Sequence, residues 1–88
     1  MLKKRLEYIF SECLGGKTDH LFFDSIKEFH KYLFENGLPD EFQLNDQAGK
    51  QLIRFTNTGT VFHISCNHQV PGSICFEIIN QEQKLLNN

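Results

Sequence analysis

Residues 52–66 read Leu-Ile-Arg-Phe-Thr-Asn-Thr-Gly-Thr-Val-Phe-His-Ile-Ser-Cys, and this stretch decides the fold. Apolar and polar side chains alternate on either side of Asn57–Thr60, whose composition is typical of a turn. The period of two predicts strands over residues 52–56 and 61–66, joined as an antiparallel hairpin. One face of the hairpin is apolar, so we expect that face to be buried. The apolar pairs that meet across it are Phe55 with Phe62 and Ile53 with Ile64.

Residues 74–79 continue the sheet on the C-terminal side. They alternate in the same way and predict a third strand, which the chain reaches through the loop 67–72. In that register Cys66 faces Ile74, so its thiol points into the core. The tail 80–88 is rich in Gln and Asn, and we expect it to be frayed.

The N-terminal segment predicts a helix. Residues 2–14 carry apolar side chains at i, i+4, i+7, i+8, i+11 and i+12, which is one face of an α-helix. Gly15-Gly16 then ends it. The apolar residues on this face are Leu2, Leu6, Ile9, Phe10, Cys13 and Leu14.

A second helix is indicated by the capping-box pattern Ser25–Glu28, with Asp24 as an alternative cap. Asn36-Gly37 ends it, and Pro39 prevents it from resuming. Leu21–Phe23 fits two interpretations, a short strand or an extension of this helix.

The chain therefore predicts an α+β fold. Residues 42–44 suggest a brief additional strand before the turn-rich residues 45–49. We expect two helices packed on one face of a three- to four-stranded antiparallel sheet, arranged as a meander. At 88 residues the chain has room for one core, so residues 1–88 form a single domain.

Cysteine usage and hydropathy bear on the compartment. Three cysteines at unrelated spacings, Cys13, Cys66 and Cys75, argue against a disulfide framework and favour a reducing cytoplasm. No run approaches the roughly 18 apolar residues of a membrane span, so we expect no membrane association.

The predicted register creates one row of ionisable side chains. Arg54, His63 and Glu77 fall side by side on the polar face of the sheet. Such a row could serve catalysis, with the carboxylate orienting the imidazole. Cross-strand charge pairing explains it more simply, because a flat sheet face lacks the concavity of an active site. We therefore expect no enzyme activity and no cofactor, and keep the three residues as a second candidate surface.

A second cluster superficially suggests zinc. His63, Cys66, His68 and Cys75 include suitable ligand types, but strand alternation turns Cys66 away from His63 and Cys75. The spacing also lacks paired knuckles, so buried or structural cysteines are the better interpretation and no metal site is predicted.

Charge is unevenly distributed. Residues 18–46 carry seven acidic and two basic residues, a net charge of −5 in a chain whose total is −2. Such a surface repels nucleic-acid phosphates and attracts a basic protein, whose encounter it accelerates by electrostatic steering. Only Lys3–Arg5 is a basic cluster, so direct nucleic-acid binding is disfavoured. The candidate partner-binding residues are Glu28, Glu35, Asp40, Glu41 and Asp46.

In its small size, acidic segment and lack of a catalytic motif, the chain resembles the bacterial immunity proteins that neutralise nuclease toxins, such as those of colicins and contact-dependent inhibition systems. The resemblance implies a cytoplasmic protein-binding inhibitor whose carboxylates stand where the toxin's nucleic-acid phosphates would lie. The alternative is a phage or mobile-element protein that inhibits or adapts a host protein, and a small zinc-binding domain ranks third. We expect a monomer, or a weak homodimer formed through exposed edge strands.

Overall fold

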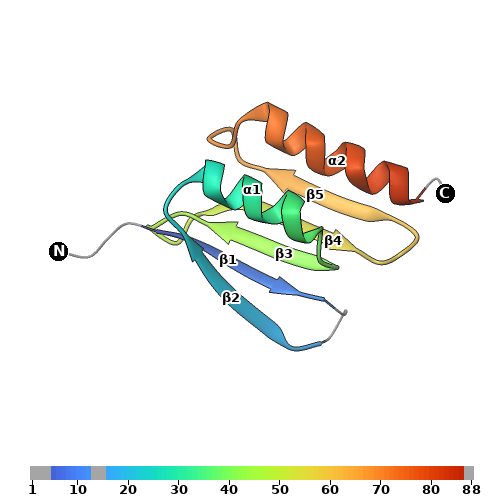
Figure 1. Ribbon diagram of the computed structural model, residues 1–88, viewed down its shortest axis with the longest axis horizontal. Coiled ribbons are helices and arrows are strands. Elements are labelled where there is room, and N and C mark those ends of the chain that lie inside the picture. The colour runs from blue at the N-terminus through green and yellow to red at the C-terminus, as the bar shows by residue number, and fades with distance from the viewer. Residues whose placement is uncertain (1–4, 13–15, 87–88) are drawn as a thin grey trace.

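The computed structural model describes residues 5–12 and 16–86, the last two without their side chains. It contains five strands and two helices (Figure 1). In chain order these are β1 (Leu6–Ser11), β2 (Thr18–Phe23), α1 (Ile26–Asn36), β3 (Glu41–Asn45), β4 (Gln51–Asn57), β5 (Phe62–Cys66) and α2 (Gly72–Leu86).

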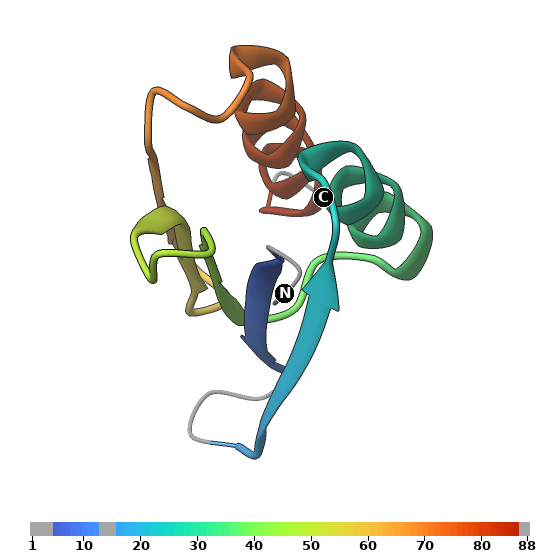
Figure 2. The same cartoon turned by 90° about the vertical axis from the view of Figure 1, so that its left-hand side faces the viewer.

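The five strands form one antiparallel sheet in the order β2-β1-β3-β4-β5. Both helices lie on the same face of this sheet, and the other face is uncovered (Figures 1 and 2). The predicted α+β class, with two helices on one face of an antiparallel sheet, is confirmed. The sheet has five strands, more than the three or four expected. The expected meander holds only for β3, β4 and β5, because β1 lies between β2 and β3, and α1 connects those two strands.

The core lies between the sheet and the helices, and its centre is a group of aromatic rings around Tyr8. The Tyr8 ring is 5.3 Å from that of Phe29 on α1 and 5.4 Å from that of Phe42 on β3, measured between centroids. Burial raises the pKa of the Tyr8 hydroxyl well above its usual range, and Tyr32 and Glu12 add to the effect. The buried apolar residues are Leu6, Tyr8, Phe29, Leu33, Phe42, Leu44, Leu52, Ile53, Phe55, Val70, Ile74 and Ile78.

The N-terminal helix prediction is wrong, because this part of the chain forms the β1–β2 hairpin. Leu6, Tyr8 and Phe10 alternate with Glu7 and Ile9, so the segment also has the period of a strand. The helical interpretation placed Ile9 and Phe10 on one side, whereas in a strand they point to opposite faces. The same hairpin shows that Leu21–Phe23 is strand.

The strand predicted over residues 74–79 is also wrong. These residues belong to α2, whose sheet-facing side chains Ile74, Ile78 and Glu82 follow the i, i+4, i+8 spacing. Phe76, which the strand interpretation placed in the core, is 67% exposed. Residues 80–86 continue the helix instead of fraying, and residues 87–88 lie outside the described part of the chain.

The second helix prediction is confirmed as α1. The Ser25 hydroxyl accepts a hydrogen bond from the Glu28 backbone N–H at 3.2 Å, and the Glu28 carboxylate accepts one from the Asp24 N–H at 3.0 Å. Gly37 follows the helix with φ 86°, a conformation that favours glycine. Strands at residues 41–45, 51–57 and 62–66 match the remaining expectations, with each bound within one residue of the predicted one.

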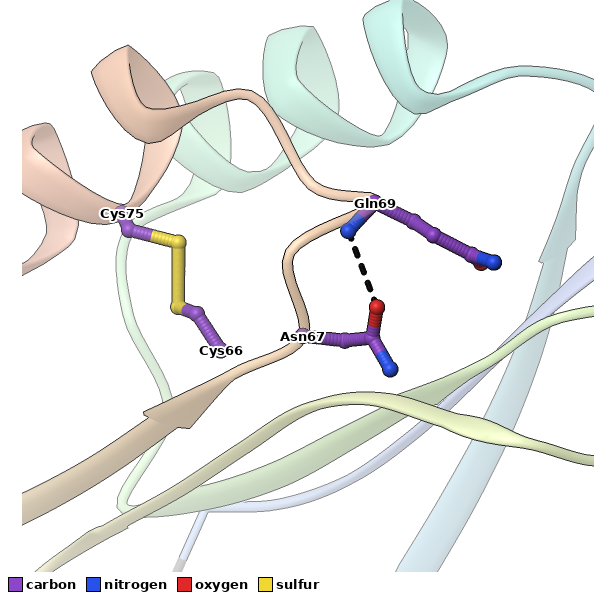
Figure 3. The surroundings of a disulfide bond; sticks show 4 residues. All are labelled: Cys66, Asn67, Gln69 and Cys75. Carbon is purple, nitrogen blue, oxygen red and sulfur yellow. Dashed lines mark hydrogen bonds between the residues drawn. A yellow bond between two sulfur atoms is a disulfide. The ribbon is translucent and has the colours of Figure 1, made fainter.

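A disulfide joins Cys66, at the end of β5, to Cys75 in the first turns of α2, with Cα atoms 6.6 Å apart (Figure 3). Between them the Asn67 side chain accepts a hydrogen bond from the Gln69 N–H at 2.9 Å. The expectation that the cysteines stay unpaired is wrong for these two, and Cys13 lies outside the described residues. Since Cys66 is exposed and bonded, it does not lie in the core as predicted. The odd number of cysteines therefore gives no support to a reducing compartment.

Glu82 holds the C-terminal half of α2 against the sheet. It is 1% exposed, and its carboxylate accepts a hydrogen bond from the Asn57 side-chain amide at 2.5 Å. Burial raises the pKa of Glu82 above its usual range, and the neighbouring charge of Asp40 raises it further. The folded protein therefore holds this proton more tightly than the unfolded chain does. The resulting stabilisation is complete below the ordinary carboxyl pKa and is lost as pH rises through the folded pKa.

We predict that Glu82→Gln removes this part of the pH dependence, because glutamine keeps the shape and the acceptor for Asn57 but carries no charge. The wild type should lose stability relative to the variant as pH rises above about 4.5, by about 1.4 kcal/mol per unit of pKa difference, until the pH passes the folded pKa. Urea unfolding followed by circular dichroism at a series of pH values measures this. A difference between the two proteins that stays constant over the range would contradict it.

We predict that replacing Cys66 and Cys75 together by Ser lowers the free energy of unfolding by about 2–3 kcal/mol, the value expected for a short closed loop. Cys13→Ser is the matched control and should retain the bond. Thiol titration of the unfolded wild type should find one reactive thiol before reduction and all three afterwards. Three thiols before reduction would show that the bond is absent.

Candidate functional site

Three carboxylates follow one another closely along the chain where α1 passes into β3, with Asp40 near Glu82 on the helix side of the sheet and Glu41 on the uncovered face. Glu35 lies in the last turn of α1, Gly37 and Pro39 form the short connection, and β3 begins at Glu41. Asp40 precedes it, and the Asp40 carbonyl accepts a hydrogen bond from the Asn57 N–H at 2.7 Å. We call Glu35, Asp40 and Glu41 the acidic end.

Both helices finish at this end of the molecule. β2 and β5 run toward the opposite end, and each is followed by a helix that returns, so α1 and α2 point the same way (Figure 1). Each helix C-terminus carries roughly half a negative charge from its aligned peptide dipoles. Lys84 is the basic residue in the last turn of α2, and the last turn of α1 has none. The backbone therefore adds to the negative potential of the three carboxylates.

No lysine, arginine or histidine of the described residues lies within ion-pair distance of Glu35, Asp40 or Glu41. Three ion pairs within the described part of the chain lie elsewhere. They join Arg5 to Asp24 at 3.6 Å, His20 to Glu7 at 2.9 Å and His30 to Glu77 at 2.6 Å. The charge of the acidic end is thus available to an external cation.

The other two carboxylates of the predicted surface, Glu28 and Asp46, do not belong to it. Glu28 lies in the first turn of α1, where it accepts the hydrogen bond from Asp24. Asp46 lies in the β3–β4 turn and accepts hydrogen bonds from the N–H groups of Ala48 and Lys50 at 2.9 and 2.8 Å. Both are therefore at the opposite end of the sheet and serve local structure.

Glu12 is a further exposed carboxylate on the side of the acidic end, which the sequence did not indicate. It follows Ser11, and Ser11 pairs with Glu41 in the β1–β3 register. The helix predicted over residues 2–14 concealed this, because the hairpin position of Glu12 depends on β1 being a strand.

The prediction that Arg54, His63 and Glu77 form one row on the sheet is wrong. Arg54 and His63 lie on the uncovered sheet face, but Arg54 pairs with Ser65 and His63 pairs with Thr56, so they are diagonal neighbours. Glu77 lies on α2, on the other side of the sheet, and contacts His30.

A groove of about 400 Å³ lies beside α1 and α2. Its lining residues are Phe34, Glu77, Asn80, Gln81 and Lys84.

The uncovered sheet face carries a small hollow of about 100 Å³ beside Glu41. Its lining joins the acidic end to the sheet face, since Glu41 opens β3 and its side chain is half-buried there. The lining residues are Ile9, Phe10, Ser11, Thr18, Glu41, Phe42, Gln43 and Arg54.

The ligand set imagined for zinc does not assemble. Cys66 and Cys75 are bonded to each other, so neither offers a thiolate. Within residues 5–12 and 16–84, no group of three histidine, cysteine, aspartate or glutamate side chains is placed to hold a metal ion.

In the part of the chain that the structure describes, no helix has the length and apolar character needed to cross a bilayer.

The chain matches no protein-family model, no curated protein and no solved structure.

Proposed function

We propose that this protein is an inhibitor that binds a basic protein through the acidic end, and that its partner is a nuclease-type toxin to which it gives immunity. The observation that carries the proposal is the position of Glu35, Asp40 and Glu41 at the end where both helices finish, with no ion pair to any of them within residues 5–12 and 16–84. Binding there would cover the cationic surface with which a nuclease holds nucleic-acid phosphates.

Electrostatics favours this use of the surface. Carboxylates and helix C-termini of one sign, concentrated at one end of a small protein, steer a cationic partner toward that end. Because the same potential repels phosphates, it opposes direct nucleic-acid binding. The protein acts in this proposal by occlusion and contributes no catalytic group.

The proposed site of action is the cytoplasm, where a nuclease toxin meets its nucleic acid. The disulfide does not conflict with this, because Cys66 and Cys75 lie at the end of the sheet where α2 begins, away from the acidic end. Occlusion therefore does not require the bond, and reduction in the cytoplasm would leave the binding surface in place.

The test starts with co-purification of the chain with the protein encoded by the adjacent gene, followed by nuclease and association-rate measurements. We predict that the triple variant Glu35→Gln, Asp40→Asn, Glu41→Gln associates about tenfold more slowly at low salt, with a flatter salt dependence. Inhibition of the nuclease should weaken in parallel.

The control adds the same charge at the opposite end. Gln47→Lys, Gln51→Lys and Gln69→Lys change three exposed residues there and raise the net charge by three, as the triple variant does. This control should associate at close to the wild-type rate. Equal slowing of both variants would show an effect of net charge alone, and an acidic partner or an unaffected triple variant would overturn the proposal.

A further inference from the structure

The hollow beside Glu41 has a shape set by side-chain length. Side chains on one face of a sheet line up across the strands, and the row at this end consists of Thr18, Ser11, Glu41, Thr56 and His63. Next to it lies the row that contains Ile9, Gln43 and Arg54. Short hydroxyl side chains on β1 and β2 beside longer ones on β3 and β4 leave the hollow open.

Arg54, the cation that lines the hollow, is bonded to Gln43 and not to Glu41. Arg54 donates from Nη1 to Gln43 Oε1 at 3.2 Å, and Gln43 donates from Nε2 to Asn45 Oδ1 at 2.8 Å. This chain of hydrogen bonds runs along the sheet face toward its opposite end. Glu41 forms no ion pair with Arg54, so the hollow keeps a half-buried carboxylate on one side.

The remaining lining suits a side chain with an apolar stem and a cationic head. Ile9, half-buried, is the aliphatic side chain on this part of the sheet face. Thr18 adds a hydroxyl that can accept a hydrogen bond at the exposed rim. Lysine and arginine bury their methylene stems against apolar surface while their charged ends reach a polar partner.

We propose that this hollow is the anchor site for one lysine or arginine side chain of the protein partner, with its charged end on the Glu41 carboxylate. The inference depends on the proposed function for the source of that side chain. It adds that the partner contacts the uncovered sheet face as well as the acidic end, and that Glu41 belongs to both. A charge-assisted hydrogen bond in a half-buried site is stronger than one at an exposed surface.

The probes for the test are Nα-acetyl-arginine methylamide and Nα-acetyl-lysine methylamide, titrated into the ¹⁵N-labelled protein and followed by NMR. The neutral norleucine analogue controls for binding of the stem alone. We predict saturable shifts at Thr18, Glu41 and Gln43, with a dissociation constant in the millimolar range that is usual for fragments of this size. The norleucine analogue should give no saturable shifts.

Three variants separate charge from shape. Glu41→Gln should weaken probe binding about tenfold, since it removes the charge but keeps the length of the side chain. Thr18→Tyr should block the hollow while leaving every charge in place, and exposed Thr18 on an edge strand tolerates the change. Glu35→Gln with Asp40→Asn removes two charges outside the hollow, one exposed and one half-buried, and should weaken binding less than about threefold.

The outcomes distinguish this inference from the proposed function. Shifts outside the hollow, equal binding to Glu41→Gln, or equal shifts with the norleucine analogue would overturn the anchor site. In that case, the proposal that the partner binds at the acidic end would still be supported if the triple variant associated with the partner more slowly than the wild type. If the probes bind in the hollow but no basic protein partner is found, the anchor site would be supported and the inhibitor function would be contradicted.

Discussion

The packing of Tyr8 fixes the rest of the structure. Its ring lies on β1 and contacts Phe29 and Tyr32 of α1, at 5.3 and 6.1 Å, as well as Phe42 of β3 at 5.4 Å. A buried aromatic group of this kind sets which strands lie beneath α1 and in which direction the helix runs. Because α1 is anchored over β1 and β3, its last turn must finish near the start of β3. Glu35 and Glu41, six residues apart in the chain, are thereby held at one end of the sheet.

The shared direction of the helices follows from the topology. β2 and β5 are the two edge strands, and both run toward the end opposite Glu41. A helix that follows either strand on the same sheet face must return in the other direction (Figure 1). The two helix dipoles therefore add, which they would not do if the helices were antiparallel. The negative ends of both helix dipoles thus lie at one end of the molecule as a consequence of strand order, and the acidic side chains there reinforce this potential, which Lys84 partly offsets.

The sequence predicted the middle of the fold correctly and its two ends incorrectly, for one physical reason. Capping chemistry at Ser25 and alternation in residues 52–66 are local signals, and each was confirmed. At the ends, apolar residues fit both periods: Leu6, Tyr8 and Phe10 alternate, and Ile74, Phe76 and Ile78 do too, yet the first set is strand and the second is helix. The deciding residue of α2 is Glu82, a buried carboxylate on the sheet-facing stripe, and a polar residue there hides the helical period. Because Glu77 was assigned to a strand, it was wrongly placed in a row with Arg54 and His63. The common position of Glu35, Asp40 and Glu41 at one end was predictable, because the chain between them is short.

The buried Glu82 carboxyl is linked to Asp40 of the acidic end, both by charge and through Asn57. Its carboxyl is buried, Asp40 of the acidic end stands near enough to raise its pKa, and Asn57 bonds both the Glu82 carboxylate and the Asp40 carbonyl. Burial is the larger cause of the raised pKa of Glu82, and the charge of Asp40 adds to it. Asp40 therefore acts on the core as well as on the acidic end: a lysine or arginine at position 40 would remove the like-charge interaction with Glu82 and lower its pKa.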